Sequence, residues 1–102
     1  MPVPPSEVRS VARQALKDRR QYGRGGTAVG VARARDIANG ANLSMSTIKR
    51  MVSFFARHGG SESETAARRD RTTAASIAWR LWGGNPGRAW AKRELRKFER
   101  KE

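Results

Sequence analysis

The sequence contains no cysteine and only one histidine among its 102 residues. Disulfide bonds and thiolate metal sites are therefore excluded. The histidine, His58, has few carboxylates near it, and no pair of carboxylates stands at a spacing suited to acid–base catalysis. We therefore expect no catalytic residues, no metal, no cofactor and no enzymatic activity.

Long apolar runs are also absent. No stretch approaches the roughly 18–20 consecutive apolar residues that span a bilayer. Residues 1–7 lack the basic and then apolar pattern of a signal peptide. We expect a cytoplasmic protein with no membrane role, because its helices also carry too few large apolar residues on one face to bind a lipid surface well.

Acidic residues are few, since 9 Asp and Glu stand against 22 Lys and Arg, which gives a formal net charge of +13. The excess is spread along the chain, with 11 basic and 3 acidic residues in 1–58 and 11 basic and 6 acidic residues in 59–102. A charge of this size predicts partners rather than a fold. Nucleic acid is the first expected partner, and an acidic protein is another.

Apolar residues recur at helical spacing, and no convincing period of two marks a strand. We predict an all-α protein, a small bundle of about five helices. The predicted helices are 6–20, 28–39, 45–58, 73–82 and 86–100. We assign 1–58 to a three-helix unit and 59–72 to a linker, part of which could extend the next helix backwards. Residues 73–102 are expected to form a helix pair that packs on the same core.

Short polar side chains mark the expected helix starts. Ser6, Thr27 and Ser44 each stand directly before a helical pattern and are predicted N-caps. Asn85-Pro86 predicts the start of the last helix, with Asn as the cap and Pro as the first helical residue. His58 is expected to interact with the C-terminus of its own helix.

The three tryptophans are interpreted as core residues. Two of them are expected to fill a small core with Ile77, Leu81 and neighbouring apolar residues. Trp79 lies off the main apolar stripe and is expected to be the most exposed. Stacking of exposed indole rings on nucleic-acid bases is the alternative.

Residues 36–51 read as two short helices joined by a tight turn. Ala38 is small enough for a second helix to cross closely, and Gly40 and Asn42 suit a turn that needs positive φ. Leu43 is the apolar residue that leaves the turn. The pattern predicts a helix-turn-helix, and a purely structural corner between two helices is the alternative.

The same residues resemble a known DNA-binding motif. The matching segments are Asp36-Ile37-Ala38, Ala41-Asn42-Leu43-Ser44 and Ser46-Thr47-Ile48-Lys49-Arg50-Met51. They are similar to the helix-turn-helix of repressors typified by the lac repressor. The resemblance implies that the second helix, which begins near Met45, reads the major groove of DNA. Ile48 and Met51 are expected to pack this helix onto the first.

The side of this helix that would face DNA is polar and basic. Its predicted base contacts are Met45, Ser46, Thr47, Lys49, Arg50 and Ser53. Arg50 is the best candidate for a bidentate contact with guanine.

Phosphate contacts are expected from other basic residues and from the glycine-rich loop. The predicted set is Arg9, Arg13, Arg24, Gly25, Gly26, Thr27, Arg33, Arg35, Arg57, Arg93 and Lys97. The loop is included because backbone N–H groups at the start of a helix can hold one phosphate. A plain flexible loop is the alternative, and the Walker pattern is excluded because its lysine is missing.

Four stretches carry a second and longer resemblance: Gly23–Arg35, Phe54–His58, Ile77–Gly84 and Gly87–Ala91. Together they resemble a region of small tailed-phage proteins and of segments beside phage head-maturation proteases. The similarity covers about residues 22–91. It implies a phage origin, with the host cytoplasm or the virion as the location, and it implies no settled activity.

The sequence therefore predicts a non-enzymatic, phage-type protein that binds double-stranded DNA and acts in transcription regulation. The alternative is a virion or host-directed module that binds an acidic protein partner. Helix-turn-helix proteins usually dimerise, and the C-terminal helix pair is the one candidate for a homodimer contact.

Overall fold

The computed structural model describes residues 2–59 and 62–101, and it confirms an all-α fold. The described residues form six helices and no strand. The helices are α1 (Ser6–Tyr22), α2 (Ala28–Ala38), α3 (Met45–His58), α4 (Glu62–Arg68), α5 (Ala74–Leu81) and α6 (Gly84–Lys101). The additional helix is α4, which lies in the segment expected to be a linker and is separate from α5.

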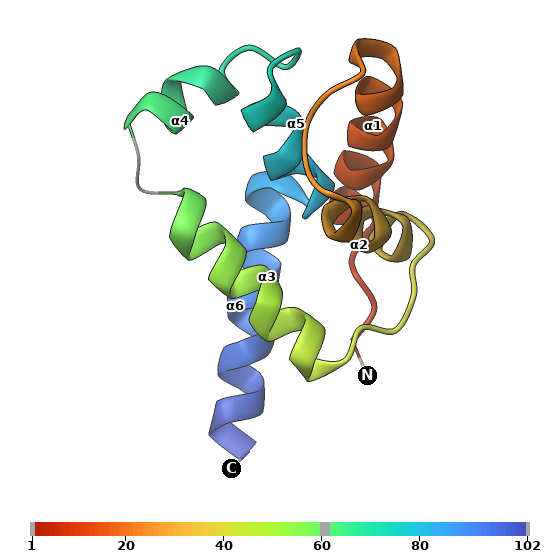
Figure 1. The fold of residues 1–102 in the computed structure, drawn as a ribbon. Helices are drawn as coiled ribbons and strands as arrows, with labels where there is room; N and C mark the ends of the chain where they lie inside the picture. Colours follow the sequence, from red (N-terminus) through yellow and green to blue (C-terminus); the bar gives the residue numbers. More distant parts are fainter. Residues whose placement is uncertain (1, 60–61, 102) are drawn as a thin grey trace.

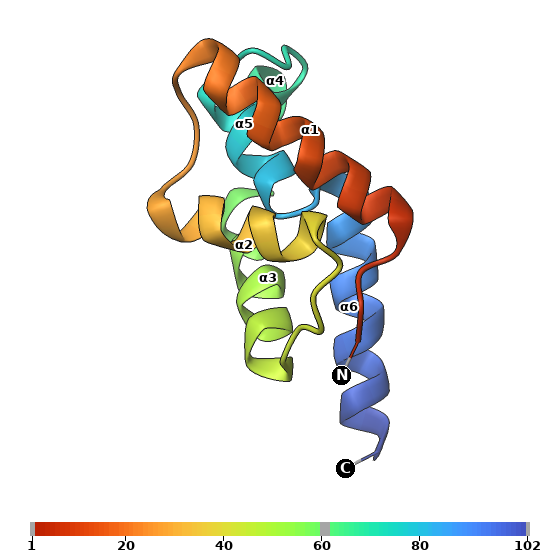
Figure 2. The same ribbon diagram turned by 90° about the vertical axis from the view of Figure 1, so that its right-hand side faces the viewer.

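The helices pack in two groups that share one core. α1 lies against α2 and α5, and α3 lies along α6 (Figures 1 and 2). α4 contacts α5, and α1 also contacts α6. The last turns of α6 extend beyond the other helices at the bottom of both views.

The expected close crossing of α2 and α3 is not observed, because α3 packs chiefly on α6. The connection between α2 and α3 is a turn at residues 39–40 followed by residues 41–44, which have no regular secondary structure. Leu43 in this connection is buried, and its N–H donates to the Pro2 carbonyl at 2.9 Å. The N-terminal segment therefore holds the connection, and Ile48 and Met51 enter the common core instead of a contact confined to α2.

The end of α2 differs in one detail from the expected turn. Gly40 adopts φ +68°, and its N–H donates to the Ile37 carbonyl, while the Ala41 N–H donates to the Asp36 carbonyl. This pair of hydrogen bonds is the Schellman arrangement, which needs a left-handed residue at the position of Gly40. Asn42 does not have positive φ. Gly40 alone supplies the conformation that both residues were expected to share.

A single hydrophobic core joins the N-terminal and C-terminal helices. Its largest fully buried apolar side chains are Val8, Ile37, Ile48, Met51, Phe55, Ile77 and Leu81. Phe54 is also buried. Residues on both sides of the α4 segment therefore depend on one another for burial, as expected for helices that share a core.

All three tryptophans are buried, and the expectation that Trp79 is exposed is wrong. The Trp79 side chain packs edge-on against Phe55 with ring centroids 4.8 Å apart, and its Nε1–H donates to Asn85 Oδ1 at 3.0 Å. Asn85 is therefore not the cap of α6, which begins one residue earlier at Gly84. The buried indole N–H needs an acceptor, and the Asn85 amide supplies it.

Two of the three predicted serine and threonine caps are confirmed. Thr27 Oγ1 accepts a hydrogen bond from the Gly30 N–H, and Ser44 Oγ accepts one from the Thr47 N–H. Ser6 is not a cap: it is the first residue of α1, Pro5 occupies the cap position, and no side chain caps this end.

Replacing Ser44 by Ala is expected to lower the free energy of unfolding by about 1 kcal/mol, because the Thr47 N–H loses its acceptor. Ser6→Ala is the matched control, and we expect it to change stability by less than about 0.5 kcal/mol. Urea unfolding of the two variants measures both effects. Equal losses from the two substitutions would contradict the assignment of the caps.

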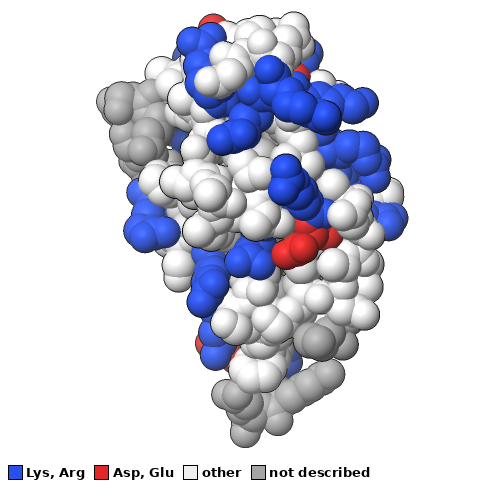
Figure 3. Space-filling model, turned by 45° about the vertical axis from the view of Figure 1, so that its right-hand side comes forward, with Lys and Arg blue, Asp and Glu red and all other residues white. Residues whose placement is uncertain are grey.

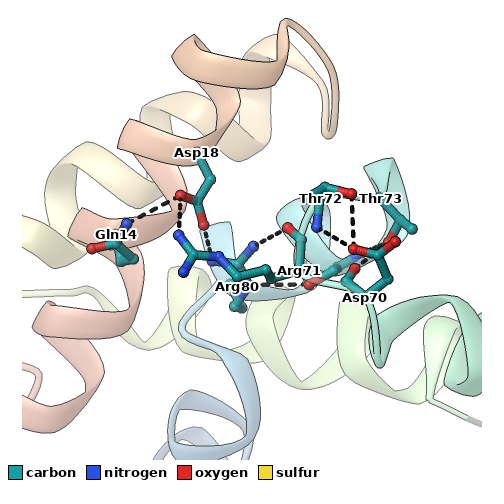
Figure 4. A network of polar contacts seen from close by, with 8 residues as sticks. Gln14, Asp18, Asp70, Arg71, Thr72, Thr73 and Arg80 are labelled. Atoms are coloured by element: carbon teal, nitrogen blue, oxygen red, sulfur yellow. Dashed lines mark hydrogen bonds and ion pairs between the residues drawn. The ribbon is translucent and has the colours of Figure 1, made fainter.

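A buried carboxylate links α1 to α5 and to the turn before it (Figure 4). Asp18 is fully buried, and it accepts hydrogen bonds from Arg80 at 2.7 Å, Arg71 at 2.9 Å and Gln14 at 3.0 Å. Burial raises the pKa of Asp18, but the hydrogen bonds from Arg80, Gln14 and Arg71 outweigh this effect and hold the pKa below its usual value. Arg80 Nη2 also donates to the Arg71 carbonyl at 2.7 Å. The network fixes the position of α5 relative to α1.

Candidate nucleic-acid interface

The outward face of α3 carries a row of polar and basic side chains. Helical periodicity directs Ile48, Met51 and Phe55 into the core. The opposite side exposes Ser46, Lys49, Arg50, Ser53 and Arg57. Ser44 caps this helix, so its start is fixed locally by the sequence.

The basic side chains on this face have no acidic partner among the side chains that the structure describes. None of the ion pairs between described side chains involves Lys49, Arg50 or Arg57. The Lys49 ammonium lies 5.3 Å from the centre of the Phe98 ring on α6, which is a cation–π distance that leaves its charge in place. Three positive charges that no described carboxylate pairs with therefore lie along one side of α3.

This face of α3 forms one wall of an open groove with a volume of about 1210 Å³. The start of α2 contributes Thr27 and Val29, and α5 contributes Ala78 among others. Arg68 of α4 also lines the groove, and its Nη1 donates to the carbonyl of His58, the last residue of α3, at 3.0 Å. In Figure 1 α3 lies at the front of the molecule, with α2 to its right and α4 above it.

Aromatic side chains from α3 and α5 line the same groove. The Phe54 and Trp82 rings are stacked, with centroids 4.8 Å apart and planes inclined by 13°. The centroid of the His58 ring lies 4.6 Å from that of the Phe54 ring. The Arg68 guanidinium lies 3.9 Å from the centre of the Trp79 ring. The groove thus combines an aromatic floor with basic side chains.

Four of the six residues predicted to contact bases lie together in the groove, namely Ser46, Lys49, Arg50 and Ser53. The other two are placed differently. Met45 is half-buried and packs against the core. Thr47 is half-buried, and its hydroxyl is 3.0 Å from Ser44 Oγ, so it belongs to the cap of α3.

Three of the residues predicted to contact phosphate also line the groove: Arg57, Gly26 and Thr27. Three of the predicted arginines contact acceptors of the protein itself. These pairs are Arg13 Nη2 with Ala38 O at 3.2 Å, Arg24 Nε with Thr72 O at 2.8 Å, and Arg33 Nη1 with Asp36 Oδ2 at 3.5 Å.

The remaining predicted phosphate contacts are spread over other helices. Arg9 is half-buried, Arg35 and Arg93 are exposed, and Lys97 pairs with Glu94 at 3.2 Å. Figure 3 shows Lys and Arg side chains at several separate places over one face, with little acidic surface between them. The structure therefore does not gather the predicted phosphate contacts into one patch.

The glycine-rich loop before α2 packs closely on α5. A Cβ atom added at Gly25 would lie 2.6 Å from Ile77 Cβ, and one added at Gly26 would lie 2.5 Å from Leu81 Cδ1. The Gly25 carbonyl accepts a hydrogen bond from Arg19 Nε at 2.9 Å. The need for a close approach to α5 accounts for both glycines without a bound phosphate.

The apolar part of the groove and Arg68 of α4 were not predicted from the sequence. Phe54 comes directly after Ser53 of the polar face and directly before Phe55. Two adjacent residues of a helix cannot both point to the centre of one apolar stripe. That geometry could have placed Phe54 at the edge of α3. Nothing local marked Val29 or Arg68, because their position depends on how α2 and α4 pack against other helices.

None of the helices in the part of the chain that the structure describes is long and apolar enough to cross a membrane. Within the same residues, no three potential metal-ligating side chains from His, Asp and Glu come together.

Comparisons with known proteins found no relative of this chain. No family model matches the sequence, no curated protein is significantly similar to it, and no solved structure is significantly similar to its fold.

Proposed function

We propose that the protein is a non-enzymatic DNA-binding protein that places the outward face of α3 against double-stranded DNA. One observation carries the proposal: Lys49, Arg50 and Arg57 are exposed along one helix face and have no carboxylate partners among the described side chains. The net charge of +13 supports the same partner, since phosphate neutralisation supplies most non-specific DNA affinity.

The dimensions of α3 suit the major groove. A helix of 14 residues is about 21 Å long and about 10–12 Å wide with its side chains, and the major groove is about 12 Å wide. Arg50 can donate two hydrogen bonds to the O6 and N7 atoms of guanine. Ser46 and Ser53 offer hydroxyl groups for base or phosphate contacts on the same side.

Phosphate contacts would come from residues beside α3. Arg57 lies one turn beyond Ser53, and Thr27 at the start of α2 lines the same groove. The exposed arginines of other helices add long-range attraction, which raises the association rate at low salt. The resemblance to tailed-phage proteins implies a phage origin, so we propose that the target is phage or host DNA; we propose further that the use is regulatory.

Replacing Lys49 and Arg50 together by Gln is expected to weaken binding to a duplex about 10-fold or more, because both proposed contacts are lost. The control is the double replacement of Lys17 and Arg20 by Gln on α1, which removes the same charge from exposed positions outside the proposed interface. We expect the control to bind within about threefold of the unchanged protein. Fluorescence anisotropy with a labelled duplex measures both variants.

The same titration repeated at several salt concentrations tests the electrostatic part of the proposal. The logarithm of the binding constant should fall linearly with the logarithm of salt concentration, with a slope of about −0.9 for each neutralised phosphate. Binding that does not change with salt would contradict the proposal. Equal weakening by the α3 variant and the α1 control would show that α3 is not the interface.

A further inference from the structure

The groove beside α3 has an apolar part that double-stranded DNA would not use. The stacked rings of Phe54 and Trp82 line it together with Trp79, and Val29 stands at its edge. Val29 is 55% exposed, which is the largest exposure of any large hydrophobic side chain that the structure describes. Phe54, Trp79 and Trp82 are only 5–9% exposed, so a small part of each faces the groove beside Val29. A duplex presents phosphates and base edges, so it offers little apolar surface to this part of the groove.

The rest of the groove is strongly basic. Lys49, Arg50 and Arg57 line the α3 side, and Arg68 lines the end formed by α4. No aspartate or glutamate is among the described residues that line the groove. An apolar floor between cationic walls is complementary to a ligand that has one apolar face and acidic flanks.

We infer that this groove is a docking site for an acidic amphipathic helix of a partner protein. Such a helix lays apolar side chains spaced at i, i+3, i+4 and i+7 into a groove. Its acidic flanks would pair with Lys49 and Arg50 on one side and with Arg68 at the end. The volume of about 1210 Å³ exceeds the roughly 300–1,000 Å³ of a small-molecule pocket.

A second copy of this chain is a poor occupant of the groove. Two molecules of net charge +13 repel each other, and the groove places further positive charge at the contact. Lys49 and Arg50 belong both to the docking groove and to the proposed DNA interface. The two ligands would therefore exclude each other, but peptide binding is measured without DNA and does not depend on the proposed function.

The test uses a designed peptide of about 15 residues, the length at which an isolated helix becomes marginally stable in water. It carries Leu at i, i+3, i+4 and i+7, has Glu at most other positions and contains no Trp. A peptide of the same composition with scrambled order is its control. Binding is followed by the intrinsic tryptophan fluorescence of the protein, because Trp79 and Trp82 line the groove. The titrations are done at roughly 0.15 M salt, where the Debye length is about 8 Å.

We expect the amphipathic peptide to bind at least about 10-fold more tightly than the scrambled one, since only it presents a continuous apolar face. Replacing Val29 by Ser is expected to weaken its binding about 5- to 10-fold. Val3→Ser is the matched control, because Val3 is also exposed, at 47%, but does not line the groove. Neither substitution changes the charge, so duplex binding should stay within about twofold for both.

Equal binding of the two peptides would overturn the inference, because it would show a general attraction to acidic polymers. Equal effects of the Val29 and Val3 substitutions would place the peptide elsewhere on the surface and overturn it as well. Absence of peptide binding, with duplex binding intact, would reject the docking site and leave the proposed DNA function standing.

Discussion

Replacing Asp18 by Asn is expected to lower the free energy of unfolding by about 3–5 kcal/mol, the usual cost of breaking a buried ion pair from one side. Asp18 is fully buried, and its carboxylate forms ion pairs with Arg80 Nη1 at 2.7 Å and with Arg71 Nη2 at 2.9 Å. The neutral amide leaves the Arg80 guanidinium, whose side chain is only 19% exposed, without its counter-charge. Urea unfolding monitored by circular dichroism measures the change.

The control for this prediction is Asp36→Asn. Asp36 also pairs with an arginine, but its side chain is 51% exposed and lies 3.5 Å from Arg33 Nη1. An exposed pair of this kind contributes about 0–1 kcal/mol. If Asp18→Asn cost no more than Asp36→Asn, the buried network would not be what holds α1 to α5.

The stabilising effect of Asp18 is expected to depend on pH. The pKa of Asp18 is lower in the folded protein than in the unfolded chain. Its stabilising contribution is therefore fully present above the unfolded value of about 3.9 and is lost as the pH falls through the lower folded value. The stability difference between the unchanged protein and Asp18→Asn should shrink below about pH 4. A difference that stays constant with pH would contradict the role of the charged carboxylate.

Replacing Gly25 by Ala is expected to cost roughly 2–5 kcal/mol of stability, because two penalties add. Gly25 has φ +102°, which an L-residue with a side chain rarely adopts. The new Cβ would also lie 2.6 Å from Ile77 Cβ and Cγ2 and 3.2 Å from the Ala74 carbonyl oxygen. Ile77 is fully buried, so it cannot move aside easily.

Gly23→Ala separates the backbone penalty from the packing penalty. Gly23 has φ +64°, and a Cβ added there would meet no atom within 4 Å. We expect only the left-handed backbone cost of about 1–2 kcal/mol. Thermal unfolding of both variants gives the comparison, and similar losses at the two positions would show that contact with α5 does not constrain the loop.

Local features of the sequence predicted most of the helices. The periodic apolar residues and the caps Thr27 and Ser44 act within about one helical turn, so a short window of sequence contains all the interacting groups. The failures have equally specific causes. Ser6 and Asn85 have the composition of caps, but α1 starts after Pro5 and the Asn85 amide is hydrogen-bonded to Trp79.

The candidate site was predicted only in part. The polar face of α3 follows from its periodicity, which is why Ser46, Lys49, Arg50 and Ser53 lie together as expected. Met45 and Thr47 were misplaced because the first turn of α3 packs on the core and forms its own cap. The aromatic floor of the groove was missed because it arises where α3 meets α5.

The sequence by itself determined the helical class, the net charge of +13 and the exposed basic face of α3. Helix hydrogen bonds and caps link residues a few positions apart, and charge needs no folding at all. The tertiary structure decided that Trp79 is buried, that α2 and α3 do not cross closely, and that Asp18 meets Arg71 and Arg80, which lie 53 and 62 residues further along the chain. Contacts across such separations form only when whole helices pack, and no local pattern encodes which helix faces will meet.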